Sequence, residues 1–233
     1  MVQLTKTKEV PEKLKVGVLA LQGAFIEHIH ILQRLPQVSL AIPVRNTDQL
    51  SLVDALIIPG GESTTIALVA ERSGLLEPLR EFVRSKPTWG TCAGMILLAN
   101  EVTQVKEGGQ KLLGGLDITV TRNKFGSQID SFEAPLHIQH VTTKAENDDD
   151  IYSLFPAVFI RAPVISQINS PDVKVIARLE HSIGDTDAST IVAVRQDHLL
   201  ATAFHPELTK DDRMHQYFVN LALESLGKRR KVA

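Results

Sequence analysis

The chain has 233 residues, of which 43% are hydrophobic, and its formal net charge is −2. This length and apolar content favour one large α/β domain and exclude an intrinsically disordered protein. The nearly balanced charge argues against a nucleic-acid partner, and no apolar run reaches the roughly 18 residues of a membrane span. The single cysteine rules out an intramolecular disulfide and favours a reducing compartment, so we expect a cytoplasmic protein.

The two ends of the chain differ from the segment between them. Residues 1–14 are polar and rich in lysine, with no apolar region after them, which predicts a disordered N-terminal lead and not a signal peptide. We expect residues 15–226 to form a single domain. Residues 227–233 form a basic tail, for which a solvated terminus is favoured over a nuclear signal.

The first hundred residues alternate between short apolar runs and segments with helical periodicity. The apolar runs predict strands at 16–21, at 40–44, at 55–58, and at a fourth place ending at Thr88-Trp89. The periodic segments predict helices at 24–35, 50–53, 63–72, 76–84 and 93–100. This alternation predicts a doubly wound, mostly parallel central sheet with helices on both faces.

The second half of the chain has a different pattern, with few helical segments between its apolar runs. Strands are predicted at 116–122, 134–141, 157–160, 173–179, 191–195 and 199–204. Strands that follow one another without helices usually pair antiparallel, so we expect an antiparallel extension of the sheet. Residues 211–226 are expected to close the chain as a helix.

The strongest chemical motif is Gly90-Thr91-Cys92-Ala93-Gly94, which lies between a predicted strand and a predicted helix. A small residue on each side of a nucleophile is typical of a sharp strand-to-helix turn, here with cysteine in the place of serine. The start of a helix favours a thiolate, which would make Cys92 a nucleophile. The alternative is a glycine-rich turn with an inert, buried thiol.

A second motif, His205-Pro206-Glu207, directly follows the apolar segment 199–204. In an extended segment the side chains at i and i+2 lie on one face, so Glu207 can hold one imidazole nitrogen of His205 while the other faces a thiol. Nucleophile, base and orienting carboxylate are the three parts of a catalytic triad. An incidental histidine in a surface turn is the alternative.

A third motif, Pro59-Gly60-Gly61-Glu62-Ser63, follows the strand predicted at 55–58. Consecutive glycines let backbone N–H groups approach a ligand, so Gly61 and Ala93 are candidates for the two donors of an oxyanion hole. A phosphate-binding loop is disfavoured because neither of the common glycine-rich phosphate patterns is present. A simple turn that begins the next helix remains open.

Together the three motifs predict acyl transfer from an amide. Cys92 would attack the carbonyl carbon, His205 would move the proton to the leaving ammonia, and backbone amides would stabilise the oxyanion. Water would then release the acid. This chemistry requires no metal and no cofactor, and the sequence contains no cluster of metal ligands.

The chain resembles class I, triad-type glutamine amidotransferases and, more narrowly, the glutaminase subunits of pyridoxal 5′-phosphate synthases. The motifs that carry the resemblance span roughly residues 15 to 222. Besides the three above, they are Val18-Leu19-Ala20-Leu21-Gln22-Gly23, Glu27-His28, Arg122-Asn123, Phe125-Gly126, Asp130-Ser131-Phe132-Glu133, Phe159-Ile160-Arg161-Ala162-Pro163 and Phe204-His205-Pro206-Glu207-Leu208.

The resemblance implies a role for each matching position. Cys92 would be the nucleophile, His205 the base and Glu207 its orienting residue. Six residues would line the glutamine site: Gly60, Gly61, Glu62, Arg122, Ile160 and Arg161. Gln22 would lie near the oxyanion hole and the interface with a partner, although a simple loop amide is an equal alternative.

The resemblance also implies a partner, a (β/α)₈-barrel synthase subunit that receives the ammonia and makes pyridoxal 5′-phosphate. Related assemblies hold twelve synthase and twelve glutaminase subunits. Three alternatives remain from the sequence: a glutaminase for a different amidotransferase pathway, a catalytically silent scaffold, and a related α/β cysteine peptidase or chaperone. The complete set of triad residues argues against the second, and the His-Pro-Glu pair against the third.

Overall fold

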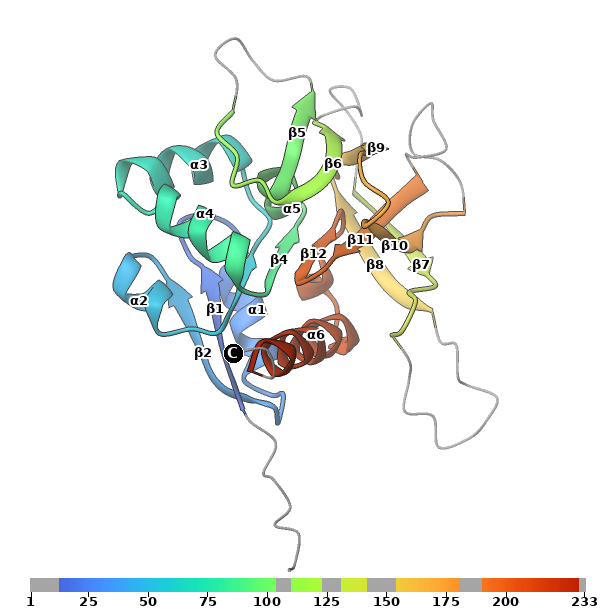
Figure 1. Ribbon diagram of the computed structural model, residues 1–233. Coiled ribbons are helices and arrows are strands. Elements are labelled where there is room, and N and C mark those ends of the chain that lie inside the picture. Colours follow the sequence, from blue (N-terminus) through green and yellow to red (C-terminus); the bar gives the residue numbers. More distant parts are fainter. Residues whose placement is uncertain (1–12, 104–109, 123–130, 142–153, 181–189, 231–233) are drawn as a thin grey trace, which may run out of the picture.

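A computed structural model of the protein describes residues 13–103, 110–122, 131–141, 154–180 and 190–230 (Figure 1). Its centre is a seven-stranded sheet in the order β10-β11-β12-β4-β3-β1-β2. These strands are β1 Leu14–Leu19, β2 Val38–Val44, β3 Ala55–Ile58, β4 Thr88–Thr91, β10 Lys174–Arg178, β11 Ile191–Gln196 and β12 Leu199–Thr202.

Five neighbouring strands of this sheet, from β2 through β1, β3 and β4 to β12, run parallel. Strand β11 runs antiparallel to β12, and β10 runs antiparallel to β11. Every residue of β3, β4 and β12 is buried, as expected for parallel strands covered on both faces. The prediction of a mostly parallel sheet with an antiparallel extension is confirmed.

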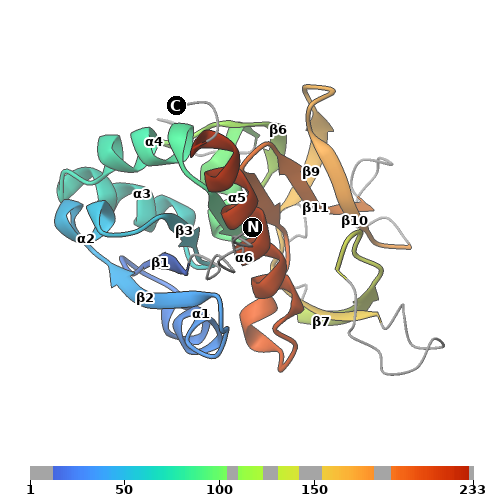
Figure 2. The ribbon, with the colours of Figure 1, turned by 60° about the horizontal axis from the view of Figure 1, so that its bottom comes forward.

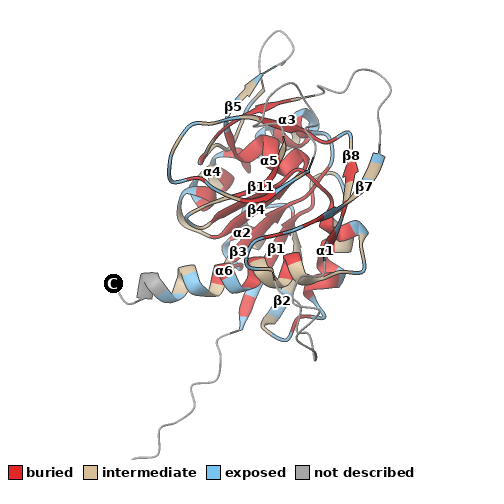
Figure 3. Ribbon diagram, turned by 90° about the vertical axis from the view of Figure 1, so that its right-hand side faces the viewer, coloured by how far each residue is buried: buried red, intermediate tan, exposed pale blue. Residues whose placement is uncertain are grey.

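Helices cover both faces of the central sheet. Figure 3 shows α3 (Ser63–Arg72), α4 (Leu76–Ser85) and α5 (Ala93–Leu98) over one face, and α1 (Phe25–Leu32) and α6 (Arg213–Arg230) over the other. The short helix α2 (Thr47–Ser51) connects β2 to β3. In Figure 2 the long helix α6 crosses the front of the sheet, and α3 and α4 lie behind and to its left.

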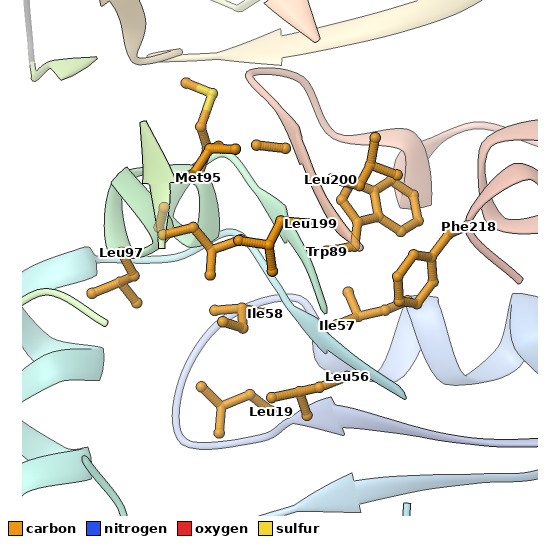
Figure 4. Close-up of a cluster of buried hydrophobic side chains, with 14 of the residues drawn as sticks. Leu19, Leu56, Ile57, Ile58, Trp89, Met95, Leu97, Leu199, Leu200 and Phe218 are labelled. Atoms are coloured by element: carbon orange, nitrogen blue, oxygen red, sulfur yellow. The ribbon is translucent and has the colours of Figure 1, made fainter. Parts of the chain in front are cut away.

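Strand β4 shows how the two faces differ. The Trp89 ring packs 5.6 Å from the Phe218 ring of α6 (Figure 4), whereas a Cβ on the next residue, Gly90, would lie 2.4 Å from the backbone of Gly94 in α5. Successive strand residues point to opposite faces. A large ring therefore fills the α6 face, while the absence of a side chain lets α5 approach the backbone of β4.

Two smaller sheets lie beside the central one. In the first, β6 (Leu116–Thr121) runs parallel to β5 (Ala99–Thr103) and antiparallel to β9 (Val164–Ile168). In the second, β7 (Ser131–Leu136) pairs antiparallel with β8 (Phe155–Ile160). The backbone N–H of His205 donates to the carbonyl of Val158 at 2.8 Å, which ties β8 to the segment that follows β12.

Several predicted boundaries differ from those in the structure. Helix α5 ends at Leu98 instead of residue 100, and the chain continues directly into β5. The side chain of Asn100 explains this extended path, because its Oδ1 accepts from the backbone of Gly115 at 2.7 Å and its Nδ2 donates to Asp117 at 2.6 Å. Strand β9 was not predicted, and α6 begins at residue 213 and extends to residue 230.

The strand predicted at 134–141 is correct only in its first part. Strand β7 ends at Leu136, and Ile138 forms only an isolated bridge to Ala177. His140 then adopts φ 64°, a left-handed conformation that no strand residue holds. The predictions for residues 1–12 and 231–233 lie outside the described residues. In the described part of the chain, no helix is long and apolar enough to cross a membrane.

Candidate active site

Four loops converge at one edge of the central sheet. Gln22 follows β1, residues 60–62 follow β3, Cys92 follows β4 and His205 follows β12. These four strands are neighbours and run parallel, so their carboxyl ends meet at the same edge. The sheet topology therefore brings together motifs that are up to 183 positions apart in the chain.

Cys92 occupies the turn between β4 and α5. Its φ is 49°, and its backbone N–H donates to the carbonyl of Thr202 at 2.8 Å. A Cβ on Gly94 would lie 2.0 Å from the carbonyl oxygen of Ile58, so only glycine fits there. The thiol is 7% exposed, and its Sγ lies 4.0 Å from the carbonyl oxygen of Ile160. The predicted tight turn is present, with its sulfur at the floor of a pocket.

His205 faces Cys92 on one side and Glu207 on the other. Its Nδ1 lies 2.7 Å from Oε1 of Glu207, whose side chain is fully buried. Burial acts to lower the pKa of His205, but the hydrogen bonds with Cys92 and Glu207 outweigh it and raise that pKa from 6.5 to about 10. At neutral pH the imidazole is therefore protonated.

The backbone around this histidine differs from the sequence-based expectation. Strand β12 ends at Thr202, and Pro206–Leu208 forms a single 3-10 turn. His205 begins that turn with φ −106° and ψ 87°. The alternation of an extended strand was thus the wrong reason for placing His205 beside Glu207. The tight turn returns the carboxylate to the imidazole instead.

A pocket of about 330 Å³ opens above Cys92. Its lining includes Gln22, Gly61, Glu62, Ser63, Cys92, Ala93, Ile96, Arg122, Ile160, Arg161, Pro163 and His205. Gly60 adjoins the pocket, because a Cβ on it would lie 2.3 Å from Cε1 of His205. The structure thus brings the predicted site residues together, with Glu207 behind His205.

Glu62 and Arg122 form an ion pair on one wall of the pocket. Arg122 donates to Oε1 of Glu62 at 3.2 Å and to Oε1 of Gln110 at 2.7 Å. Glu62 also begins α3, accepting from the backbone N–H groups of Thr64 at 3.2 Å and Thr65 at 2.6 Å. Burial acts to raise the pKa of Glu62, but hydrogen bonds from the hydroxyl of Thr65 and from the backbone N–H groups of Thr65 and Thr64 lower it overall, so the carboxylate is charged.

Gln22 holds the loop at residues 60–62 in place. Its Oε1 accepts from the backbone N–H of Glu62 at 2.7 Å, and a Cβ on Gly61 would lie 2.4 Å from that same oxygen. Gly61 therefore has no room for a side chain. In this structure Gln22 acts as a loop amide at the pocket wall, and its predicted role at a partner interface stays a prediction.

Arg161 is exposed at the pocket rim and has φ 44°. Among the described residues, four that are not glycine have positive φ, and the two that line the pocket are Cys92 and Arg161. Such conformations cost of order 1–3 kcal/mol and cluster at functional sites. Arg161 directly follows Ile160, whose carbonyl oxygen lies 4.0 Å from the thiol.

Some site residues were missed or lie outside the described part of the chain. Ile96 was not predicted to line the pocket, and Pro163 and Ser63 stood only as the last residues of two motifs with no role assigned to them. The motif positions Asn123, Phe125, Gly126 and Asp130 lie outside the described residues. Within the described ranges, no group of three histidine, cysteine or acidic side chains could hold a metal ion.

Solved structures show the class to which this fold belongs. A crystal structure described as a glutamine amidotransferase matches with a TM-score of 0.74 and 43% identity, covering 89% of this chain and 98% of that one. A putative GMP synthase subunit from Thermoplasma acidophilum matches with a TM-score of 0.59 at 16% identity, over 94% of this chain and 98% of that one. The fold is that of the glutamine amidotransferases.

Sequence relatives identify the family. The model of the SNO glutamine amidotransferase family matches residues 18–224. A probable pyridoxal 5′-phosphate synthase subunit from Arabidopsis thaliana is 48% identical over 91% of this chain and 87% of its own length. A pyridoxal 5′-phosphate synthase subunit from Herpetosiphon aurantiacus is 50% identical over 89% of this chain and all of its own length. This chain belongs to the SNO glutamine amidotransferase family.

Proposed function

We propose that this chain is the glutaminase subunit of a pyridoxal 5′-phosphate synthase, which hydrolyses L-glutamine to L-glutamate and ammonia for a synthase subunit. The observation that carries the proposal is the buried series of thiol, imidazole and carboxylate at the floor of a pocket, in a member of a glutamine amidotransferase family. The relatives named as synthase subunits support the choice of pathway.

The proposed reaction starts from the thiolate of Cys92 and the imidazolium of His205. The thiolate attacks the amide carbon of the glutamine side chain, and the carbonyl oxygen becomes an oxyanion held by the N–H groups of Gly61 and Ala93. His205 gives its proton to the amide nitrogen, and the C–N bond breaks to release ammonia. The product is a glutamyl thioester on Cys92.

Hydrolysis of the thioester completes the cycle. His205, now neutral, takes a proton from a water molecule while the water oxygen attacks the thioester carbon. The C–S bond breaks, which restores the thiolate and the imidazolium and gives glutamate with a protonated side-chain carboxyl group, and this proton passes to solvent. Glu207 holds the Nδ1–H of His205 throughout, so that Nε2 always faces the reacting atoms.

The pocket wall supplies charges for the amino-acid end of glutamine. Glu62 is an anion and can bind the ammonium group, whereas Arg122 and Arg161 can bind the carboxylate. The backbone at Gly60, Gly61 and Ile160 completes the site. The hydrogen bonds from Thr64 and Thr65 fix Glu62 before substrate arrives, which lowers the entropic cost of binding.

The partner in this proposal is a (β/α)₈-barrel synthase subunit in an assembly of twelve plus twelve chains in the cytoplasm. Residues 15–226 would act as a single domain, with Gln22 at the interface. The contact that Gln22 makes with the loop at residues 60–62 supports such a role, because this loop carries Gly61, one of the two proposed oxyanion donors. The chemistry of the site requires no metal or cofactor.

An ammonia-release assay with and without a cognate synthase tests the proposal. We expect strong stimulation by the synthase and complete loss of activity in Cys92→Ala. Activity that is indifferent to the synthase would favour a glutaminase of a different amidotransferase pathway. Absence of activity under both conditions would refute the proposal and leave the catalytically silent scaffold and the related peptidase or chaperone.

A further inference from the structure

Two buried histidines lie behind the candidate triad, His28 in helix α1 and His215 in helix α6. Oε2 of Glu207 lies 3.4 Å from Nε2 of His28 in α1, and Nδ1 of His28 lies 2.8 Å from Nε2 of His215 in α6. Both histidines are completely buried. The triad mechanism uses neither of them.

The protons on these rings can be assigned from what each nitrogen faces. Oε2 of Glu207, Nε2 of His28 and Nδ1 of His215 make no hydrogen bond in the described part of the chain, although Oε2 of Glu207 and Nε2 of His28 lie only 3.4 Å apart. An unprotonated Nε2 on His28 would place its lone pair against the carboxylate of Glu207, which is repulsive. His28 therefore carries its proton on Nε2 and donates toward Glu207.

This choice fixes the tautomer of the next ring. Because Nδ1 of His28 is then an acceptor, Nε2 of His215 must carry a proton and donate across the 2.8 Å contact. Only a bare Nδ1 on His215 remains without a partner, and a buried acceptor without a donor costs less than a buried carboxylate without one. All donors thus point toward Glu207.

We infer that His28 is a positioning residue for glutamine hydrolysis, holding the second carboxylate oxygen of Glu207 while His205 holds the first, and that His215 sets the tautomer of His28. The inference rests on the proposed function. The 3.4 Å contact is not a hydrogen bond in this structure, and the inference is that it tightens into one when substrate binds, as catalytic contacts in resting active sites often do.

The surroundings support a neutral donor at this position. Burial lowers the pKa of His28 to about 3 against the opposing attraction of Glu207, and burial together with the charge of Arg34 lowers the pKa of His215 to about 3. The neighbouring charged groups that shift these two pKa values are Glu207 and His205 for His28, and Arg34 for His215. A neutral N–H orients the carboxylate without neutralising it, so Glu207 keeps its charge for His205.

Aromatic packing fixes the two rings. The Trp89 ring lies 5.8 Å from the ring of His28 and 5.1 Å from the ring of His215, both edge to face. Trp89 precedes the nucleophile by three positions in the same strand-and-turn segment. The helices α1 and α6 and the nucleophile strand thereby share one packed cluster, which sets where Glu207 lies relative to Cys92.

Two substitutions at position 28 distinguish a role of His28 as a hydrogen-bond donor from a role in filling space. In His28→Gln the side-chain amide nitrogen reaches the place of Nε2 and can still donate to Glu207. In His28→Asn the shorter amide reaches only the place of Nδ1. His198→Asn is the matched control, because it removes a histidine contact of 2.8 Å to the carbonyl of Val83 outside the pocket.

The first readout is alkylation of Cys92 by iodoacetamide at pH 7, which reports the thiolate directly because the chain has one cysteine. We expect His28→Asn to slow alkylation about tenfold, less than the roughly 10⁴-fold effect of disabling an orienting carboxylate itself. With the synthase, kcat should fall by a similar factor while KM changes less than about twofold. His28→Gln and His198→Asn should stay near wild type.

Several results would overturn the inference. One is a wild-type alkylation rate in folded His28→Asn, and another is an equal loss in His28→Gln and His28→Asn. If His28→Asn does not fold, nitrogen-15 NMR of wild-type histidines decides: Nε2–H tautomers at both His28 and His215 support the inference, and an Nδ1–H tautomer at His28 refutes it. Alkylation and NMR need no glutamine, so an inactive wild type would refute the proposed function separately.

Discussion

Acidification should destabilise this protein through the two histidines buried behind the site. The pKa of His28 and that of His215 are each lowered from 6.5 to about 3 in the folded chain, chiefly by burial. Between these values the unfolded chain binds more protons than the folded one. The free energy of unfolding therefore falls as pH falls from about 6.5 toward 3, and the contribution of both rings is fully present above pH 6.5.

The expected size of this effect is large. One pH unit within the window is worth about 1.4 kcal/mol for each group. At pH 5 each histidine lowers the free energy of unfolding by about 2 kcal/mol, and both lower it by about 4 kcal/mol. Domains are typically stable by about 5–15 kcal/mol, so this loss is a substantial part of the total.

His205 acts in the opposite direction. Its pKa is raised to about 10, so its contribution to stability is complete below 6.5 and is lost as pH rises through 10. The three histidines together predict maximal stability near pH 6.5. The raised pKa depends first on the hydrogen bonds of His205 with Cys92 and Glu207 and then on their charges, so the alkaline limb should weaken in Cys92→Ala.

Urea unfolding between pH 5 and pH 7.5 measures the acid limb. Trp89 is the only tryptophan, is completely buried and packs against both rings, so its fluorescence reports this cluster, and far-UV circular dichroism reports the fold. The double variant His28→Leu/His215→Phe supplies the comparison, because neither new side chain titrates. A difference between wild type and variant that stays constant over this pH range would refute the reasoning.

Three further predictions concern activity with the synthase present. Glu207→Gln should lower kcat by up to about 10⁴-fold, because the amide no longer fixes the tautomer of His205; steady-state kinetics would show it, and a loss below tenfold would contradict it. Gly60→Ala should abolish most ammonia release, because its Cβ would lie 2.3 Å from Cε1 of His205, whereas Gly227→Ala meets nothing within 4 Å and should match wild type. Arg122→Gln should raise KM about tenfold with a smaller change in kcat, as expected for loss of a charged hydrogen bond to substrate; an unchanged KM would exclude this role.

Much of the site could be predicted because its chemistry follows strand ends. The apolar runs at 55–58 and 199–204 and the strand ending near Trp89 were recognisable, and each is followed by a motif with glycine, cysteine or histidine. Parallel topology then places these motifs at one sheet edge. In the structure β12, β4, β3 and β1 are neighbours, so the motifs that follow them meet at one edge.

The remaining parts depend on contacts that local sequence does not encode. Strand β5 is polar and is held extended by the long-range hydrogen bonds of Asn100, so its sequence resembles the end of the preceding helix. The contact between His28 and Glu207 joins residues 179 positions apart. A buried histidine on the apolar face of α1 gave no sign of its partner. The contact between His28 and Glu207 depends on how α1 and α6 pack against Trp89, which the local sequence does not encode.

The central claim is that Cys92 carries the glutamyl group during turnover. Wild-type protein with its synthase and glutamine can be quenched in acid within a turnover, digested and mapped by mass spectrometry. The account predicts a glutamyl thioester on the Cys92 peptide that is absent without glutamine. Steady ammonia release with Cys92 unmodified, and with its alkylation rate undiminished by saturating glutamine, would contradict it.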